Sequence, residues 1–253
     1  MPLVDTDAIV LHAFDYLESS RIVRLATRDA GVQSVIAKGA RRPRGNFATA
    51  LDLFAEGSAH FSLRPGRDLH TLAGFDVTRV RTELAADLAR FSAASAIAEL
   101  VLRFGNDEAH PELYALLASV LDTLAVSAAV DTRGVALSGA WRFVATFGFA
   151  PSLEQCARCL AVLDDDEVTA FSHREGGALC ASCARGTPGV RTLPAAARRT
   201  IVAWLAAGDP APLDDATLRA HQRLLREFVQ EHLADGRPMR AWDSWEKATW
   251  TAG

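Results

Sequence analysis

Residues 21–37, RIVRLATRDAGVQSVIA, indicate how the first part of this chain folds. Apolar and polar side chains alternate on both sides of Asp29-Ala30-Gly31, a pattern typical of two strands joined by a tight turn. Residues 8–14, AIVLHAF, show the same pattern just before them. Two further strands are indicated at residues 51–63 and 69–78, because a proline and a glycine in the segment between them favour a turn. The first 81 residues are therefore predicted to form a sheet of five short strands.

Five short strands in so small a region suit a closed barrel better than a sandwich, and a five-stranded barrel of the oligonucleotide-binding type (OB-fold) fits the count. From Thr82 onward the apolar period changes from two to about 3.6, which predicts helices. The Thr82 hydroxyl is a candidate N-cap for the first of them. Glycine-rich and polar segments predict breaks between these helices at residues 105–107, 131–134 and 148–151.

The second half of the chain is predicted to be mostly helical, with one interruption. Helices are expected at residues 195–206 and 215–233, whereas the tail at 241–253 looks loosely ordered despite its three tryptophans. The predicted fold class is thus α+β. An OB-fold barrel would occupy residues 1–81 and an α-helical domain residues 82–253, with a four-cysteine ribbon inserted at about 152–190.

The charge balance limits how the protein could bind a polyanion. The 253 residues include 27 Lys and Arg against 31 Asp and Glu, which gives a formal net charge of −4. A protein that coats nucleic acid with its whole surface would be basic, so any such binding is expected to use a local patch. Asp5 and Asp7 argue against an export signal at the start, and Asp122 argues that the apolar stretch at 113–130 is a buried helix. We expect a cytoplasmic protein.

Four cysteines form two pairs with the same spacing, Cys156-Ala-Arg-Cys159 and Cys180-Ala-Ser-Cys183. A two-residue gap lets both sulfurs of a pair point at one ion, and the twenty residues between the pairs can return the second pair to the first. This spacing predicts one structural Zn²⁺ held by four thiolates rather than a redox site. The nearby His173 could replace a cysteine, but four thiolates saturate a closed site, so His173 is expected at the surface.

A short loop concentrates positive charge after the third predicted strand. Lys38, Arg41, Arg42 and Arg44 fall within seven positions, and no acidic residue lies between Ala30 and Leu51. Such a patch suits phosphate binding, although a charge run is commonly only a solvated face. Barrels of the predicted type bind single strands through a basic groove with aromatic stacking, which favours the nucleic-acid reading. Phe47, just beyond the loop, could stack on a base.

Two further charged segments lie near the cysteines. Arg198-Arg199 is a second candidate DNA-binding patch, with an exposed helix face as the slightly favoured alternative. The run Asp164-Asp165-Asp166-Glu167 would repel a phosphate backbone, so the ribbon is expected to stabilise the fold rather than to read DNA. The acidic run itself is interpreted as a solvated hairpin tip.

The sequence resembles the RecO family of bacterial recombination mediators. The resemblance rests on Asp7-Ala8-Ile9-Val10-Leu11, on Val35-Ile36-Ala37-Lys38-Gly39-Ala40-Arg41-Arg42-Pro43, and on the order barrel, helical body and four-cysteine ribbon. It implies a nucleoid-associated protein that binds single- and double-stranded DNA and anneals complementary strands. It also implies that the protein acts on DNA coated by the single-strand DNA-binding protein and works with RecR to load the RecA recombinase.

The resemblance also implies roles for particular residues. The family's DNA-contacting loop falls on Lys38, Arg41 and Arg42, and its ribbon ligands fall on the four cysteines. A site for the tail of the single-strand DNA-binding protein would lie on the helical body, but no motif fixes its residues. An apolar groove lined by basic side chains is expected there, because the tail is acidic and apolar.

A catalytic role is not expected. The sequence has no G-x-x-x-x-G-K-[ST], G-x-G-x-x-G, H-E-x-x-H or G-x-S-x-G motif, and its seven histidines are scattered. Asp5 and Asp7 alone would make a weak magnesium site. The alternative from another class is a zinc-ribbon adaptor that bridges other proteins, in which the basic loop is incidental.

Overall fold

The computed structural model describes residues 3–41, 47, 51–64, 66–208, 212–233 and 237–248. The chain forms two compact units. Unit 1 comprises residues 1–132 together with 239–253, so that the C-terminal segment returns to the N-terminal part. Unit 2 comprises residues 133–238. No described helix is both long enough and apolar enough to cross a membrane.

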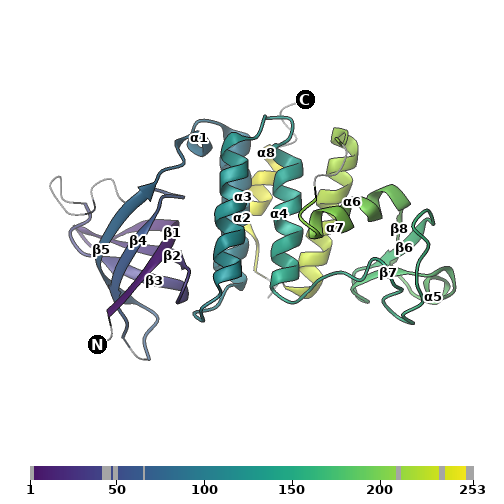
Figure 1. Ribbon diagram of the computed structural model, residues 1–253, viewed down its shortest axis with the longest axis horizontal. Coiled ribbons are helices and arrows are strands. Elements are labelled where there is room, and N and C mark those ends of the chain that lie inside the picture. Colours follow the sequence, from purple (N-terminus) through teal and green to yellow (C-terminus); the bar gives the residue numbers. More distant parts are fainter. Residues whose placement is uncertain are drawn as a thin grey trace. The chain divides into compact units, whose positions relative to one another are not determined.

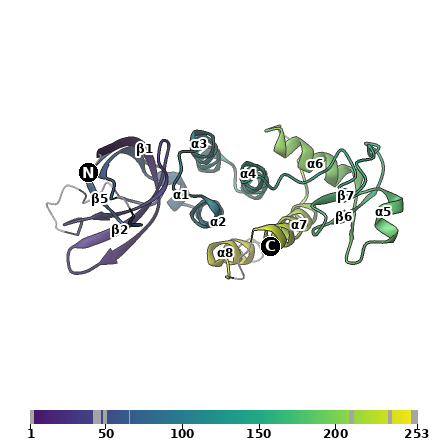
Figure 2. The same cartoon turned by 90° about the horizontal axis from the view of Figure 1, so that it is seen from below.

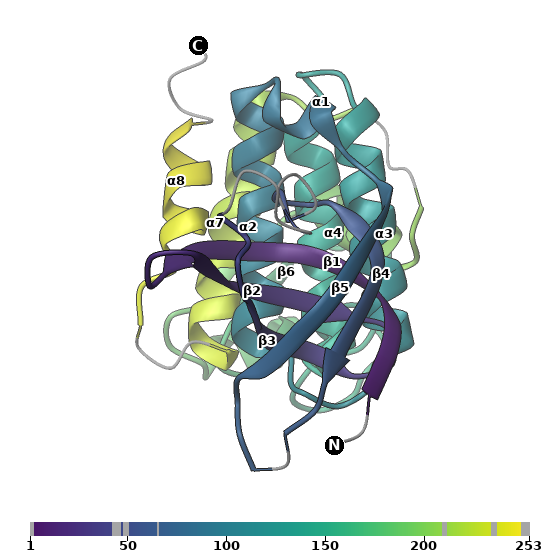
Figure 3. The same ribbon diagram turned by 90° about the vertical axis from the view of Figure 1, so that its left-hand side faces the viewer.

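Unit 1 begins with a closed barrel of five strands (Figures 1 and 3). The strands are β1 (Leu3–Tyr16), β2 (Ser20–Thr27), β3 (Gly31–Ala37), β4 (Glu56–Ser62) and β5 (His70–Arg79). Their order around the barrel is β1-β2-β3-β5-β4. All pairs are antiparallel except β3 with β5, and the long β1 pairs with both β2 and β4. The predicted OB-fold barrel is confirmed.

The apolar side chains of the alternating strand pattern fill the interior of the barrel. Val23 and Leu25 of β2, Val35 of β3 and Phe61 of β4 are all fully buried and belong to one apolar cluster. The turn between β2 and β3 contacts the segment that follows the first long helix, since the Val32 amide donates to the Asn106 carbonyl at 2.7 Å. Gly31 is required there: its φ is +64°, and a Cβ would lie 2.4 Å from two carbonyl oxygens.

Helices complete unit 1: α1 (Thr82–Ala85), α2 (Leu88–Phe104), α3 (Pro111–Val126) and α8 (Arg240–Ala248). The Asp87 carboxylate caps α2 by accepting the Arg90 amide, and the His110 ring caps α3, which starts at Pro111. The predicted Thr82 cap is wrong: the N-cap residue of the short α1 is Arg81, without a side-chain cap bond. Arg81 is instead buried and tied to the barrel.

A buried charge network joins the barrel to α3. The Arg81 guanidinium donates to Glu56 Oε2 of β4 at 2.6 Å and to Asp122 Oδ1 of α3 at 2.7 Å. Tyr114 donates its hydroxyl to the other Glu56 oxygen at 2.8 Å, and burial together with this bond raises the pKa of Tyr114. Asp122, whose side chain is 39% exposed, therefore ties α3 to the barrel, and this apolar stretch forms a helix, as the sequence predicted.

The prediction of a loosely ordered tail is wrong for residues 240–248, which form helix α8. Its Trp242 and Trp245 are 2% and 1% exposed, and their rings meet edge to face at 5.1 Å. The Trp242 amide donates to Glu99 of α2 at 3.0 Å. The helix thus packs on α2 and closes the core of unit 1.

Unit 2 contains three helices and a small sheet: α4 (Thr132–Thr146), α6 (Ala195–Leu205), α7 (Asp215–His232), β6 (Thr169–Ser172), β7 (Gly177–Leu179) and β8 (Arg191–Leu193), with the short α5 (Ala181–Arg185). The sheet order is β7-β6-β8 (Figure 1), and Figure 2 shows β6 and β7 beside α5. Trp141 of α4 and Phe171 of β6 both pack on Phe228 of α7. The ribbon and the helices of unit 2 therefore share one core.

Candidate metal centre and nucleic-acid interface

The four predicted ligands come together in the ribbon of unit 2. The sulfurs of Cys156, Cys159, Cys180 and Cys183 all lie within 4.8 Å of one another. The first pair sits in a tight turn, in which the Leu160 amide donates to the Cys156 carbonyl at 2.9 Å. The second pair sits where β7 runs into α5, with Cys180 at the N-cap. Four sulfurs at this separation fit one tetrahedral metal ion, as expected.

The local environment favours a thiolate at Cys180, whereas hydrogen bonds with Cys180 and Cys159 raise the pKa of Cys183. Hydrogen bonds from the Ser182 hydroxyl and from the Cys183 amide lower the pKa of Cys180 to about 6. The sulfur of Cys180 lies 3.1 Å from the Ser182 oxygen. Metal binding requires the deprotonated sulfur, so this arrangement prepares the site for a cation.

The ribbon has little core of its own. Its apolar cluster contains four buried residues, Cys156, Leu163, Ala178 and Leu179, one of which is itself a ligand. So small a core provides limited hydrophobic stabilisation, which metal binding or packing on other elements must supplement.

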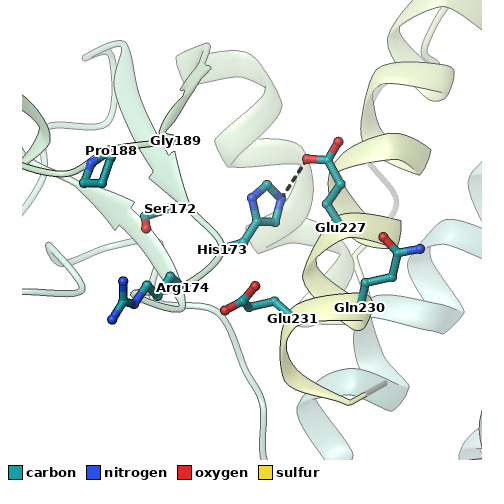
Figure 4. Close-up of a pocket in the computed structure, with 8 residues that line it drawn as sticks. All are labelled: Ser172, His173, Arg174, Pro188, Gly189, Glu227, Gln230 and Glu231. Carbon is teal, nitrogen blue, oxygen red and sulfur yellow. Dashed lines mark ion pairs between the residues drawn. The ribbon is translucent and has the colours of Figure 1, made fainter. Parts of the chain in front are cut away.

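His173 is not at the surface, contrary to expectation, and it is not a ligand. Its side chain is 12% exposed, and its Nε2 lies 3.2 Å from the Leu224 carbonyl and 3.5 Å from the Glu227 carboxylate of α7. Figure 4 shows it with Glu227 and Glu231 at a pocket of about 430 Å³. Burial lowers the pKa of His173, while Glu227 opposes that change. The residue fastens the ribbon to α7.

Arg198 and Arg199 do not form an open basic patch. Arg198 is 2% exposed, and its guanidinium donates to the Leu153 carbonyl at 2.9 Å and to the Asp164 carbonyl. Arg199 pairs with the Asp166 carboxylate at 2.8 Å. The acidic run, predicted as a solvated hairpin tip, is exposed. Its backbone carbonyls and the Asp166 carboxylate accept hydrogen bonds from these two arginines. Arg198 is therefore a structural residue and not available to phosphate.

The basic loop is only partly described. Lys38 is exposed directly after β3, and no carboxylate of the described residues pairs with it. Arg41 is exposed as well, although its guanidinium lies 3.4 Å from Asp15. Arg42 and Arg44 lie outside the described residues. Phe47 is 6% exposed and belongs to the barrel core, so the expectation that it stacks on a base is wrong.

Two exposed aromatic side chains that were not predicted lie at the same end of the barrel. Phe14 and Tyr16, at the end of β1, are 43% and 40% exposed. Their positions two residues apart in a strand were a usable signal, because alternate residues share a face.

Comparison with known proteins identifies the family. Residues 1–81 match the family model described as Recombination protein O N terminal, and residues 85–241 match Recombination protein O C terminal. A protein named DNA repair protein RecO from Anaeromyxobacter sp. (strain K) is 39% identical over 245 residues, covering 92% of each chain. Proteins of the same name from a Nocardioides species and from Desulfatibacillum aliphaticivorans are 32% and 30% identical, over 91% and 92% of this chain and 94% and 93% of their own. This chain belongs to the RecO family.

Proposed function

We propose that this protein is a DNA-binding recombination mediator in DNA repair. It binds single- and double-stranded DNA, anneals complementary strands and, with RecR, helps to load RecA onto DNA coated by the single-strand DNA-binding protein. The observation that carries this proposal is the similarity to proteins named DNA repair protein RecO, which extends over nine tenths of the chain. It acts without turnover of its own and works in the cytoplasm, on the nucleoid.

The barrel holds the DNA through charge. Lys38 and Arg41 present an ammonium and a guanidinium to solvent on a molecule of net charge −4, so they concentrate positive potential at one end of the barrel. In the sequence, Arg42 and Arg44 add two further positive charges to this loop. Neutralising phosphates there releases counterions, and affinity then falls steeply as salt rises. Asp15 lies near Arg41 but is itself exposed, so a phosphate can replace it at small cost.

A salt series of DNA binding tests this role of the loop. Reversing the charge at Lys38, Arg41 and Arg42 to Glu should lower affinity for any sequence at least about tenfold and flatten the dependence on salt, because phosphate contacts are lost. The matched control reverses Arg185, Arg223 and Arg240, which are exposed on other elements. Equal affinity of the wild type and the loop variant would rule the loop out, and equal losses in both triple variants would reduce the effect to net charge.

We propose that the ribbon binds one Zn²⁺ as a structural ion. The supporting observations are the all-sulfur donor set and the small core around it. Zinc supplies no reaction step here; it holds the two cysteine pairs together. Metal analysis of the purified chain should return one zinc per molecule, and replacing Cys180 by serine should lower that number. Iron or an absence of metal in the wild type would contradict the assignment.

A further inference from the structure

The last residues of strand β1 present a row of aromatic rings to solvent. From His12 to Tyr16 the strand pairs regularly with β2, so its side chains alternate. Ala13 packs toward the barrel core, whereas His12, Phe14 and Tyr16 lie on the outward face. The rings of His12 and Phe14 are in contact, with centroids 5.6 Å apart. Among the aromatic Phe, Tyr and Trp side chains that the structure describes, only Phe149 is comparably exposed.

This face continues across the neighbouring strands. Phe14 pairs with Ile22 of β2, which pairs with Ile36 of β3, and both isoleucines are only half-buried. The three paired residues thus form an apolar row across β1, β2 and β3, which lie side by side in Figure 3. Exposed apolar area of this kind in a soluble protein commonly marks a binding surface.

Cations lie at the same end of the barrel. The Arg41 amide donates to the Ser19 carbonyl in the β1–β2 turn at 3.1 Å, which fixes the basic loop against this hairpin. Lys38 follows Ala37, whose partner in β2 is Arg21. Asp15, between the two aromatic residues, turns to the other face of the hairpin, where it meets Arg21 at 3.2 Å and Arg41 at 3.4 Å. No carboxylate of the described part of β1 thus interrupts the aromatic row between His12 and Tyr16.

We propose that Phe14 and Tyr16 stack on unpaired bases of a DNA single strand whose phosphates the adjacent cations hold. The inference rests on the proposed DNA binding and assigns its preference for single strands. A rise of about 3.3 Å per residue sets the Cα atoms of Phe14 and Tyr16 roughly 7 Å apart on the same face, a spacing that successive bases of an extended strand can span. In a duplex each base face is already covered by its neighbours, so rings on a barrel surface engage only unpaired bases.

Charge complementarity favours this occupant over an apolar protein segment. An uncharged peptide that covered the two rings would provide no counter-charge for Lys38 and Arg41, whereas a single strand provides both base faces and phosphates. Stacking is tolerant of sequence because every base has a π-face, which suits a mediator that acts on any sequence.

The test compares single- and double-stranded DNA with the double variant Phe14→Ala/Tyr16→Ala. Affinity for an oligothymidine should fall about tenfold or more, because stacking of each base is lost. Affinity for a duplex should change less than about twofold, and the salt slope should stay the same, because no charge is altered. The matched control is Phe149→Ala, an exposed phenylalanine of unit 2. Circular dichroism and melting of each variant confirm that the barrel is folded.

Two readouts make the outcome decisive. Adding Phe14→Trp to the Tyr16→Ala variant should restore its affinity for single-stranded DNA. In the wild type, a single strand that contains 5-iododeoxyuridine should crosslink to Tyr16. An equal loss for single strand and duplex, or no loss for either, overturns the stacking role. If the aromatic variant binds normally while the loop reversal does not, the proposed DNA binding stands and this inference alone fails. If neither change affects DNA binding, the proposed interface fails as well.

Discussion

His221 is a buried histidine that must stay neutral. It is 2% exposed in unit 2, its ring lies edge to face on Trp204 at 4.9 Å, and neither ring nitrogen has a hydrogen-bond partner among the described residues. Burial lowers the pKa of His221 to about 4. In the unfolded chain the same ring has a pKa of about 6.5. Between these values the unfolded state binds the extra proton.

The stability of unit 2 should therefore fall in mild acid. The contribution of His221 is fully present above about pH 6.5 and is lost as the pH drops toward 4, which amounts to about 2 kcal/mol by pH 5. Burial lowers the pKa of His173 too, so it adds in the same direction. Denaturant unfolding of the wild type and of His221→Leu, each at pH 7.5 and pH 5, isolates the contribution of His221 to the free energy of unfolding. A variant that loses as much stability as the wild type over this range would contradict it.

Single residues differ in how far the sequence predicts them. The four cysteines were predictable because a metal imposes a fixed local spacing, which the structure reproduces. Arg198 was not, since its burial depends on the chain around Leu153 and Asp164 folding over its helix. The prediction for Phe47 was wrong for the same reason, because nothing in the local sequence shows whether a phenylalanine beside a basic loop faces inward.

Helix α8 shows how an element of nine residues depends on distant packing. An isolated helix of this length is unstable in water, so its order comes from the contacts of Trp242 and Trp245 with unit 1. Trp245→Ala should lower the free energy of unfolding of unit 1 by about 3 to 5 kcal/mol, as for other large-to-small changes in a core. Lys247→Ala, on the exposed side, is the control. Calorimetric melts that coincide for Trp245→Ala and Lys247→Ala would show that α8 adds no stability.

The contrast between the strands and α8 explains which elements the sequence predicts. The barrel strands carry an alternating pattern over many residues, and turns such as the one at Gly31 separate them. The two buried tryptophans of α8 are three residues apart, which is a helical spacing, but the flanking segment offers too short a pattern to be distinguished from a loose tail. Its partner, α2, precedes it by more than a hundred residues in the chain.

At the scale of the whole molecule, the barrel and the ribbon each have an apolar interior of their own. The barrel cluster around Val35 and Phe61 belongs to unit 1, whereas the ribbon cluster around Cys156 and Leu179 belongs to unit 2. The ribbon can be perturbed through the proposed metal ion, because the free energy of metal binding is also folding free energy for the segment that holds the ion.

Removing the metal should loosen the ribbon and leave the barrel intact. With a chelator, or in Cys180→Ser, protection of the β6 and β7 amides against hydrogen exchange should fall at least about tenfold, because so few apolar residues hold these strands. Exchange in β1–β5 should be unchanged. Val162→Ser, at a ribbon position that is 81% exposed, is the control for a change in this segment that touches no ligand. Unaltered protection of β6 and β7 after complete loss of the ion would show that apolar packing on α7 suffices, and faster exchange in β1–β5 would show that the two interiors unfold together.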